Sequence, residues 1–246
     1  MGHRRPEGPP PPPVVQRVVL RYAKRGPLRF ASSRDLGRAF ERAIRRAGIP
    51  IAFSAGFHPH PRISYLGAAP TGAASEAEYL ELRLSERRDP AALAAALGAA
   101  LPAGVAVLAA ADGTDGLGAA LPRLLRASAW RLEWPGASPA DVAGAARALD
   151  KAAEATVVRA ARPGHSQPRR VEVRPAVLSL RADPDGGRGP AIEAVLDNGP
   201  PTVRPDDLAA ALAALAPALG AAPPSLTRLA QGVPTPGSEA LDQPLG

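Results

Sequence analysis

Residues 32–48, SSRDLGRAFERAIRRAG, constrain the fold more than any other segment, because they carry both ends and the buried face of a helix. Ser32 and Asp35 have the spacing of a capping box, and Gly48 followed by Pro50 is typical of a helix end. Apolar residues at helical spacing predict the buried face: Leu36, Phe40, Ala43, Ile44 and Ala47. Arginines recur on another face, and we call them the arginine row: Arg34, Arg38, Arg42 and Arg45. The segment therefore predicts an amphipathic helix with a separate row of positive charge.

Strand patterns on both sides of this helix complete a first domain. A second helix is predicted at 89–102, where Asp89 precedes the apolar run as its cap. The order of elements is β-α-β-β-α-β, which is the split βαβ pattern of a ferredoxin-like domain. We predict this domain over 14–112, after a disordered Pro-rich tail at 1–13. Its strands are expected at 14–26, 62–66, 78–86 and 104–111.

The same order, with one extra strand, recurs in a second predicted domain over 124–230. A Gly-rich linker at 113–123 separates the two, and residues 231–246 are expected to be a disordered tail. The sequence thus predicts an α+β protein with two tandem ferredoxin-like units. In the second unit we expect strands at 127–134, 155–162 and 225–230, a hairpin over 171–199 that turns at Asp185-Gly186-Gly187, and helices at 138–152 and 204–219.

Positive charge and aromatic residues are concentrated in the first quarter of the chain. Residues 1–65 contain 13 Lys and Arg against 3 Asp and Glu, whereas the remainder contains 17 against 20. All four Phe and all three Tyr lie between Tyr22 and Tyr79. Basic and aromatic residues in one segment are typical of RNA-binding surfaces, although the core of a small basic domain has the same composition. Phosphate contacts are expected from the arginine row together with Arg21, Lys24, Arg25, Arg29 and Arg62.

The segment GFHPHPR, residues 56–62, is the sharpest local feature, and we call it the histidine loop. Proline after each histidine favours an extended backbone, so His58 and His60 can point the same way. A metal site with Glu78 as third ligand and acid/base chemistry by His58 or His60 are both open, but a rigid loop that presents donors to a ligand or simply packs is favoured. We therefore predict no metal site.

Other motifs exclude or weaken further functions. The segment 67–79, GAAPTGAASEAEY, lacks the lysine of a P-loop and the spacing of a dinucleotide fingerprint, which argues against nucleotide hydrolysis. Trp130 and Trp134 are expected to be core and edge residues of the sheet rather than a base-stacking pair. Glu172 and Arg174 are predicted to lie on one face of a strand, where a structural ion pair is favoured over a functional role. No apolar run reaches the length of a membrane span and no signal peptide is present, so we expect a cytoplasmic protein.

Four stretches together resemble a family of uncharacterised radical-SAM-linked proteins, whose members are encoded beside or fused to a cobalamin-binding radical SAM protein. They are RYAKRGPLRFASSRDL, RAIRRAGIPIAFSAGFHPHPRISY, AAPTGAASEAEYLEL and VEVRP. This sequence has Ser33 where many members have His, His58 where many have Asn, and Glu172 where Asp is expected. The resemblance therefore makes His60, with Phe57 and Arg62, the better candidates for a shared role. It also implies a partner enzyme, because a radical SAM enzyme holds its cluster with cysteines and this chain has no Cys.

The function that we predict is a non-catalytic, cofactor-free accessory protein that binds tRNA or rRNA for a separate radical SAM enzyme. Phe57 would stack on a base, His60 would hydrogen-bond, and Arg62 would contact phosphate. Two alternatives remain: a metal-independent endoribonuclease that uses His60 or His58, and a protein–protein adaptor. Cleavage that His60→Ala abolishes would identify the first, and co-purification that survives nuclease treatment would identify the second.

Overall fold

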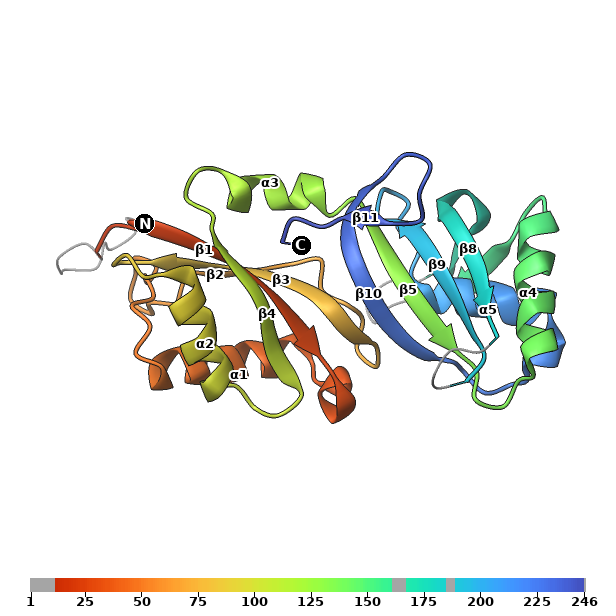
Figure 1. The fold of residues 1–246 in the computed structure, drawn as a ribbon, viewed down its shortest axis with the longest axis horizontal. Coiled ribbons are helices and arrows are strands. Elements are labelled where there is room, and N and C mark those ends of the chain that lie inside the picture. The colour runs from red at the N-terminus through yellow and green to blue at the C-terminus, as the bar shows by residue number, and fades with distance from the viewer. Residues whose placement is uncertain (1–11, 161–166, 185–188, 246) are drawn as a thin grey trace. The chain divides into compact units, whose positions relative to one another are not determined.

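The computed structural model describes residues 12–160, 167–184 and 189–245, which divide into two units (Figure 1). The first unit extends to Arg123 and includes the C-terminal residues from Pro244, and the second extends from Leu124 to Gln243. Both contain helices and antiparallel strands, so the predicted α+β class is confirmed. None of the helices in the described residues is long and apolar enough to cross a membrane.

The first unit is a four-stranded antiparallel sheet covered by helices. Its strand order is β4-β1-β3-β2, and α1 and α2 share the apolar core with one face of the sheet (Figure 1). The opposite face carries Glu81, and Gly118 of α3 lies against that carboxylate. The elements are β1 Gln16–Lys24, a 3-10 helix Gly26–Phe30, α1 Ser33–Arg46, β2 Ile63–Leu66, β3 Ala74–Leu84, α2 Pro90–Ala100, β4 Val105–Asp112 and α3 Leu117–Leu124.

The first core is built from alternate residues of the strands and one face of α1. Phe40 is fully buried, and its ring meets Tyr22 of β1 edge-on at a centroid distance of 4.9 Å. The predicted apolar face of α1 is therefore confirmed. The buried members of this core include Val18, Leu20, Tyr22, Leu36, Phe40, Ala43, Ile44, Leu80, Leu82, Leu84, Leu93 and Leu97.

Both ends of α1 follow the local signals of the sequence. The Ser32 hydroxyl accepts a hydrogen bond from the Asp35 backbone N–H at 3.2 Å and donates one to the Asp35 carboxylate at 2.7 Å. Gly48 has a φ of +62°, a conformation that favours glycine, and Ile49 N–H returns to the Ile44 carbonyl. These caps fix the helix so that its apolar stripe is buried and the arginine row faces outward.

The second unit has the strand order β10-β5-β9-β8, with antiparallel pairing between all neighbours. A separate two-stranded sheet pairs β6 with β7. Trp130 and Trp134 are both buried in the core, so they are structural residues as predicted, although an edge position was also expected. The elements are β5 Ala127–Glu133, α4 Pro139–Lys151, β6 Thr156–Arg159, β7 Arg169–Glu172, a 3-10 helix Arg174–Ala176, β8 Val177–Asp183, β9 Ala191–Asp197, α5 Pro205–Leu215, a 3-10 helix Pro217–Leu219, β10 Ser225–Pro234 and β11 Leu241–Asp242.

Two segments expected to lack structure contain regular elements. The segment 113–123, expected as a linker, contains most of α3, in which Leu121 is fully buried. The expected disordered tail at 231–246 instead completes β10 and adds β11, which pairs Leu241 with Pro234. Glycines and prolines suggested loops there, but a few apolar side chains provide contacts that hold both segments. The predicted tail at 1–13 lies almost entirely outside the described residues, as does the turn at 185–187.

Candidate nucleic-acid interface

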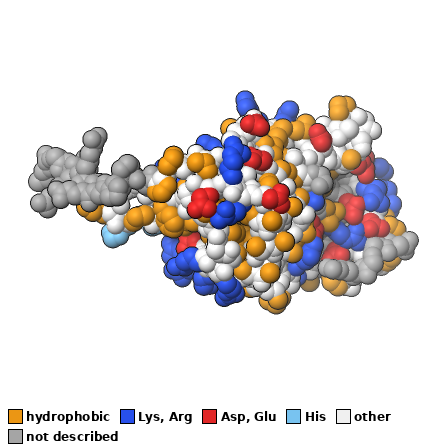
Figure 2. All heavy atoms as spheres, turned by 60° about the vertical axis from the view of Figure 1, so that its left-hand side comes forward, with side chains coloured by type: hydrophobic (Ala, Val, Ile, Leu, Met, Phe, Trp, Pro, Cys, Tyr) orange, Lys and Arg blue, Asp and Glu red, His pale blue; other side chains and the backbone are white. Residues whose placement is uncertain are grey.

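The arginine row is exposed along α1. Arg34, Arg38, Arg42 and Arg45 all reach solvent, and among the described residues none of them has a carboxylate within 4.0 Å. Figure 2 shows Lys and Arg side chains gathered on the lower part of the face in view, and a histidine beside hydrophobic side chains. Cations without partner carboxylates raise the local potential and attract anions. The row therefore presents a positively charged surface to solvent.

The base of the histidine loop is held by backbone hydrogen bonds. Ser54 N–H donates to the His60 carbonyl at 2.9 Å, and Arg62 N–H donates to the Ala52 carbonyl at 2.8 Å. The Ser54 hydroxyl also accepts from His60 N–H at 3.0 Å. The backbone of Arg83 in β3 joins both ends: the Ala52 N–H donates to the Arg83 carbonyl, and the Arg83 N–H donates to the Arg62 carbonyl. The sheet edge therefore fixes the ends of the loop, while His58 and His60 remain exposed.

A pocket of about 240 Å³ lies between α1 and the histidine loop, and we call it the α1 pocket. Arg45 of the arginine row and His60 of the loop both line it, so the structure brings these two predicted residues together. Phe57 and Arg62 are not among its walls. The lining residues are Glu41, Ile44, Arg45, Ile51, Phe53, Pro59, His60 and Pro61.

Four aromatic side chains of the first unit are exposed to an unusual degree. Phe57 at the loop tip is 66% exposed, Phe30 60%, Phe53 42% and Tyr65 40%. Although part of the Tyr65 ring is exposed, its hydroxyl lies against Gly37 of α1, and the loss of water there, with the neighbouring Glu41 carboxylate, raises the pKa of Tyr65. Exposed aromatic rings beside exposed arginines are a combination that binds unstacked bases in RNA-binding proteins.

The turn KRGPLRF does not form an open phosphate cradle. Lys24 is only 3% exposed, and its ammonium donates to the Pro70 carbonyl. Arg25 is exposed but forms a two-pronged ion pair with Glu76, and that hydrogen bonding raises the pKa of Arg25. Arg29 lies over the Phe30 ring at 4.7 Å. Of the three cations predicted here, Arg29 is the one placed beside an exposed aromatic ring.

Glu78 occupies a structural position. It is only 2% exposed, and both carboxylate oxygens accept from the Ala69 backbone N–H at 3.3 Å. His58 and His60 are exposed, and within the described parts of the chain no three His, Cys, Asp or Glu side chains group as metal ligands. This geometry gives no support to a metal centre of these three residues.

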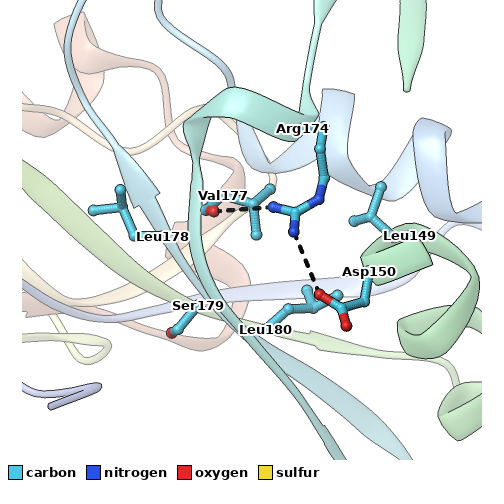
Figure 3. A pocket seen from close by; sticks show the side chains of 7 residues that line it. All are labelled: Leu149, Asp150, Arg174, Val177, Leu178, Ser179 and Leu180. Atoms are coloured by element: carbon cyan, nitrogen blue, oxygen red, sulfur yellow. Dashed lines mark hydrogen bonds and ion pairs between the residues drawn. The ribbon is translucent and has the colours of Figure 1, made fainter. Parts of the chain in front are cut away.

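The side chains of Glu172 and Arg174 do not form an ion pair with each other, although the Arg174 backbone N–H donates to the Glu172 carboxylate at 3.3 Å. Glu172 ends β7 and accepts from the Thr156 hydroxyl at 2.6 Å and from Ala155 N–H at 2.7 Å. Arg174 begins a 3-10 helix, where its guanidinium reaches Asp150 at 3.3 Å and the Val177 carbonyl at 3.5 Å (Figure 3). The strand ends between the two residues, so they do not share a face. Arg174 also lines a small pocket of about 60 Å³, together with Asp150 and Val177.

Glu172→Gln is expected to lower the free energy of unfolding by about 1 kcal/mol at neutral pH, a modest value because water screens the partly exposed carboxylate. The Thr156 hydroxyl and the Ala155 N–H lower the pKa of Glu172. A carboxyl with a depressed pKa stabilises the fold above its unfolded pKa and loses that contribution as the pH falls through the folded one. The difference in free energy of unfolding between wild type and Glu172→Gln should therefore disappear as the pH falls. Urea titrations from pH 7 downward measure this difference. Glu154→Gln, at an exposed position, is the control and should not change the stability. A difference that grows in acid would contradict the stabilising role of the Glu172 carboxylate.

Two residues of the α1 pocket carried no sequence signal of function. Phe53 lies between two short apolar runs and resembled a core residue, whereas Glu41 resembled an ordinary solvated acid. Glu41 lies one helical turn before Arg45, but α1 carries a second acid among its arginines, Asp35, so charge pattern alone did not single out Glu41.

The comparisons with known proteins give a family match and distant structural likenesses. The sequence model of a family described as "Uncharacterized protein conserved in bacteria (DUF2344)" matches residues 17–205. No curated protein matches the chain. Among solved structures, a chain of the "Crystal Structure of a Cbf5-Nop10-Gar1 Complex" is 14% identical, with a TM-score of 0.46 over 98% of this chain. This chain spans 58% of the length of that one.

Proposed function

The chain belongs to the DUF2344 family of uncharacterized proteins conserved in bacteria, and from that premise we propose that it is an RNA-binding accessory protein. It presents RNA, tRNA or rRNA in the first instance, to a separate modifying enzyme. The observation that carries the proposal is the arginine row, four exposed guanidinium groups that form no ion pair within 4.0 Å among the described residues, on the same helix that lines the α1 pocket.

Exposed aromatic rings support RNA over other polyanions. A protein that binds an acidic partner protein needs complementary charge, but it has no need of several exposed rings around that charge. Phe53, Phe57 and Tyr65 all belong to the segment that follows α1, and His60 lines the same pocket as Arg45. Single-stranded RNA uses both features, because its backbone binds cations while its unstacked bases bind aromatic faces.

The enzyme that we propose as partner is a cobalamin-binding radical SAM protein. The sequence resemblance described above supports this choice, and the composition supports a division of labour. The chain has no Cys, so the thiolates that hold an iron–sulfur cluster have to come from another protein. In this proposal the present chain supplies RNA affinity, and the partner supplies the chemistry in the cytoplasm.

We also infer that the two units are tandem ferredoxin-like domains. The strand orders β4-β1-β3-β2 and β10-β5-β9-β8 support this, because each unit places its first and third core strands at the centre of an antiparallel sheet. The β6–β7 ribbon is then an insertion before the second core strand of the second domain. The domain boundary falls near Arg123.

The test is a titration of the full chain against total tRNA and a short single-stranded RNA at several salt concentrations. We expect affinity to fall steeply with salt, because each neutralised phosphate releases counterions, and we expect the RNA to remain intact on a gel. His60→Ala is titrated in parallel. Absence of binding to both RNAs at the lowest salt would overturn the proposal.

One observation favours an endoribonuclease as a second candidate: Glu41 and His60 line the same pocket and are a possible acid/base pair. The same gel decides between the candidates. RNA cleavage that is lost in His60→Ala identifies an enzyme, whereas binding without cleavage identifies an accessory protein. Capture of a partner protein that survives nuclease treatment, without RNA affinity, identifies an adaptor.

A further inference from the structure

We propose that the α1 pocket receives a single unstacked guanine base and thereby gives the protein a preference for RNA with an unpaired G. The inference rests on the proposed RNA binding and adds base specificity to it. Three features of the pocket carry it: its size and apolar walls, the Glu41 carboxylate, and the position of the pocket beside the arginine row.

The size and walls of the pocket fit one base. Its volume of about 240 Å³ lies below the range of roughly 300–1,000 Å³ that is typical of sites for larger organic ligands. The floor and sides are apolar, formed by Ile44, Ile51 and two prolines, and Phe53 offers a ring that is 42% exposed. A flat heteroaromatic ring is expected to bind favourably in this pocket, because it buries both of its faces and stacks on Phe53.

Glu41 selects among the bases. An ionised carboxylate accepts hydrogen bonds with two adjacent oxygens and donates none. The Watson–Crick edge of guanine presents two adjacent donors, N1–H and the N2 amino group, so both oxygens are satisfied. Adenine and cytosine present one amino donor beside a ring-nitrogen acceptor, and uracil presents one N–H between two carbonyls. Each of these three bases therefore places an acceptor against the carboxylate.

The Glu41 carboxylate is available for this role. Among the described residues it forms no ion pair within 4.0 Å, although it lies on the most basic helix of the chain. Arg45 donates its Nε–H to the Glu41 backbone carbonyl at 3.3 Å, and the neighbour that feels the Glu41 charge is the Tyr65 phenol. Desolvating a carboxylate is costly unless donors replace the lost water, so a base with two donors gains most at this position.

The surroundings place the rest of the nucleotide. Arg45 and His60 line the pocket, and Arg42 and Arg38 continue the arginine row along α1. A base inserted beside Arg45 brings its own phosphate to that guanidinium and the neighbouring phosphates to the row. The loop that forms the other wall is already closed by the Ser54–His60 and Arg62–Ala52 hydrogen bonds, so little ordering opposes binding.

The experiment compares fluorescein-labelled U12 RNA with the same oligonucleotide carrying one central G, by anisotropy with the full chain at low salt. We expect the G-containing RNA to bind about 10-fold more tightly, since a well-placed pair of hydrogen bonds is worth 1–3 kcal/mol of discrimination. RNA with inosine at that position, which lacks the N2 amino group, should bind about 3-fold more tightly than U12. RNA with a central A or C should bind no more than 2-fold more tightly than U12.

Matched variants assign the preference to Glu41. Glu41→Gln removes one negative charge, so both RNAs should bind slightly more tightly while the G preference falls below 2-fold. Glu86→Gln changes the charge equally on an exposed acid of the same unit and should keep the preference. Equal binding of all bases by the wild-type protein overturns the guanine pocket and leaves RNA binding intact. Failure to bind any of the oligonucleotides overturns both.

Discussion

The double substitution Arg38→Glu with Arg42→Glu is expected to weaken binding of a short single-stranded RNA about 100-fold at low salt. Both side chains are exposed on α1, and neither has a carboxylate within 4.0 Å in the described part of the chain. Each reversal removes one phosphate contact and adds one repulsive charge to the same surface. A loss of about 1.4 kcal/mol for each site gives the 100-fold figure.

The salt dependence distinguishes lost contacts from a general change in net charge. Each phosphate contact on single-stranded RNA contributes roughly 0.7 to the slope of log affinity against log salt. The double variant should therefore lower that slope by about 1.4. Titrations at four or five salt concentrations measure it directly, and circular dichroism checks that α1 remains folded.

The matched control is Arg87→Glu with Arg88→Glu, which makes the same change in net charge within the first unit. Both side chains are exposed and make only surface ion pairs, with Asp112 and Glu86. We expect this control to lose less than 5-fold in RNA affinity, because it changes the overall charge but removes no phosphate contact of the arginine row. Equal losses in the two double variants would show that RNA does not bind at the arginine row.

The parts of the fold that the sequence predicted correctly depend on local interactions. The start of α1 required only the spacing of Ser32 and Asp35, and its end required only Gly48. The apolar stripe and the arginine row followed from helical periodicity. Strands flanked by clear turn residues were predicted for the same reason, since the pattern repeats within a few residues.

The errors fall where contacts are distant in sequence. Lys24 was expected on the surface as a phosphate contact, but β1 is buried on both faces at its end, and the ammonium bonds to Pro70, 46 residues away. The end of β7 between Glu172 and Arg174 separates two side chains that seemed to share a strand. Neither outcome has a local signal.

The candidate site shows the same division between local and distant information. Arg45 and His60 were both predicted to be functional, but the pocket that joins them also needs Glu41 and Phe53. These residues approach one another because the chain turns at Gly48 and because β3 holds the two ends of the loop through Arg83. That arrangement depends on the whole sheet, so the composition of the segment could suggest RNA binding but could not locate a base pocket.

Phe40→Ala is expected to destabilise the first unit by about 4 kcal/mol, a typical cost for truncating a buried phenylalanine. The ring is fully buried, meets Tyr22 at 4.9 Å and Tyr65 at 6.1 Å, and holds α1 on the sheet. Such a loss is a large share of the stability of an ordinary domain. It should therefore shift the denaturant midpoint strongly.

The signals of this experiment can be assigned to one unit. All three tyrosines lie in the first unit and both tryptophans in the second, so near-ultraviolet dichroism of tyrosine follows the unit that contains Phe40, and tryptophan fluorescence provides an internal reference. Phe57→Ala makes the same chemical change on a ring that is 66% exposed and should stay within about 0.5 kcal/mol of the wild type. If the two variants lose similar stability, Phe40 is not the anchor of α1, and the packing that positions the arginine row has to come from elsewhere in the helix.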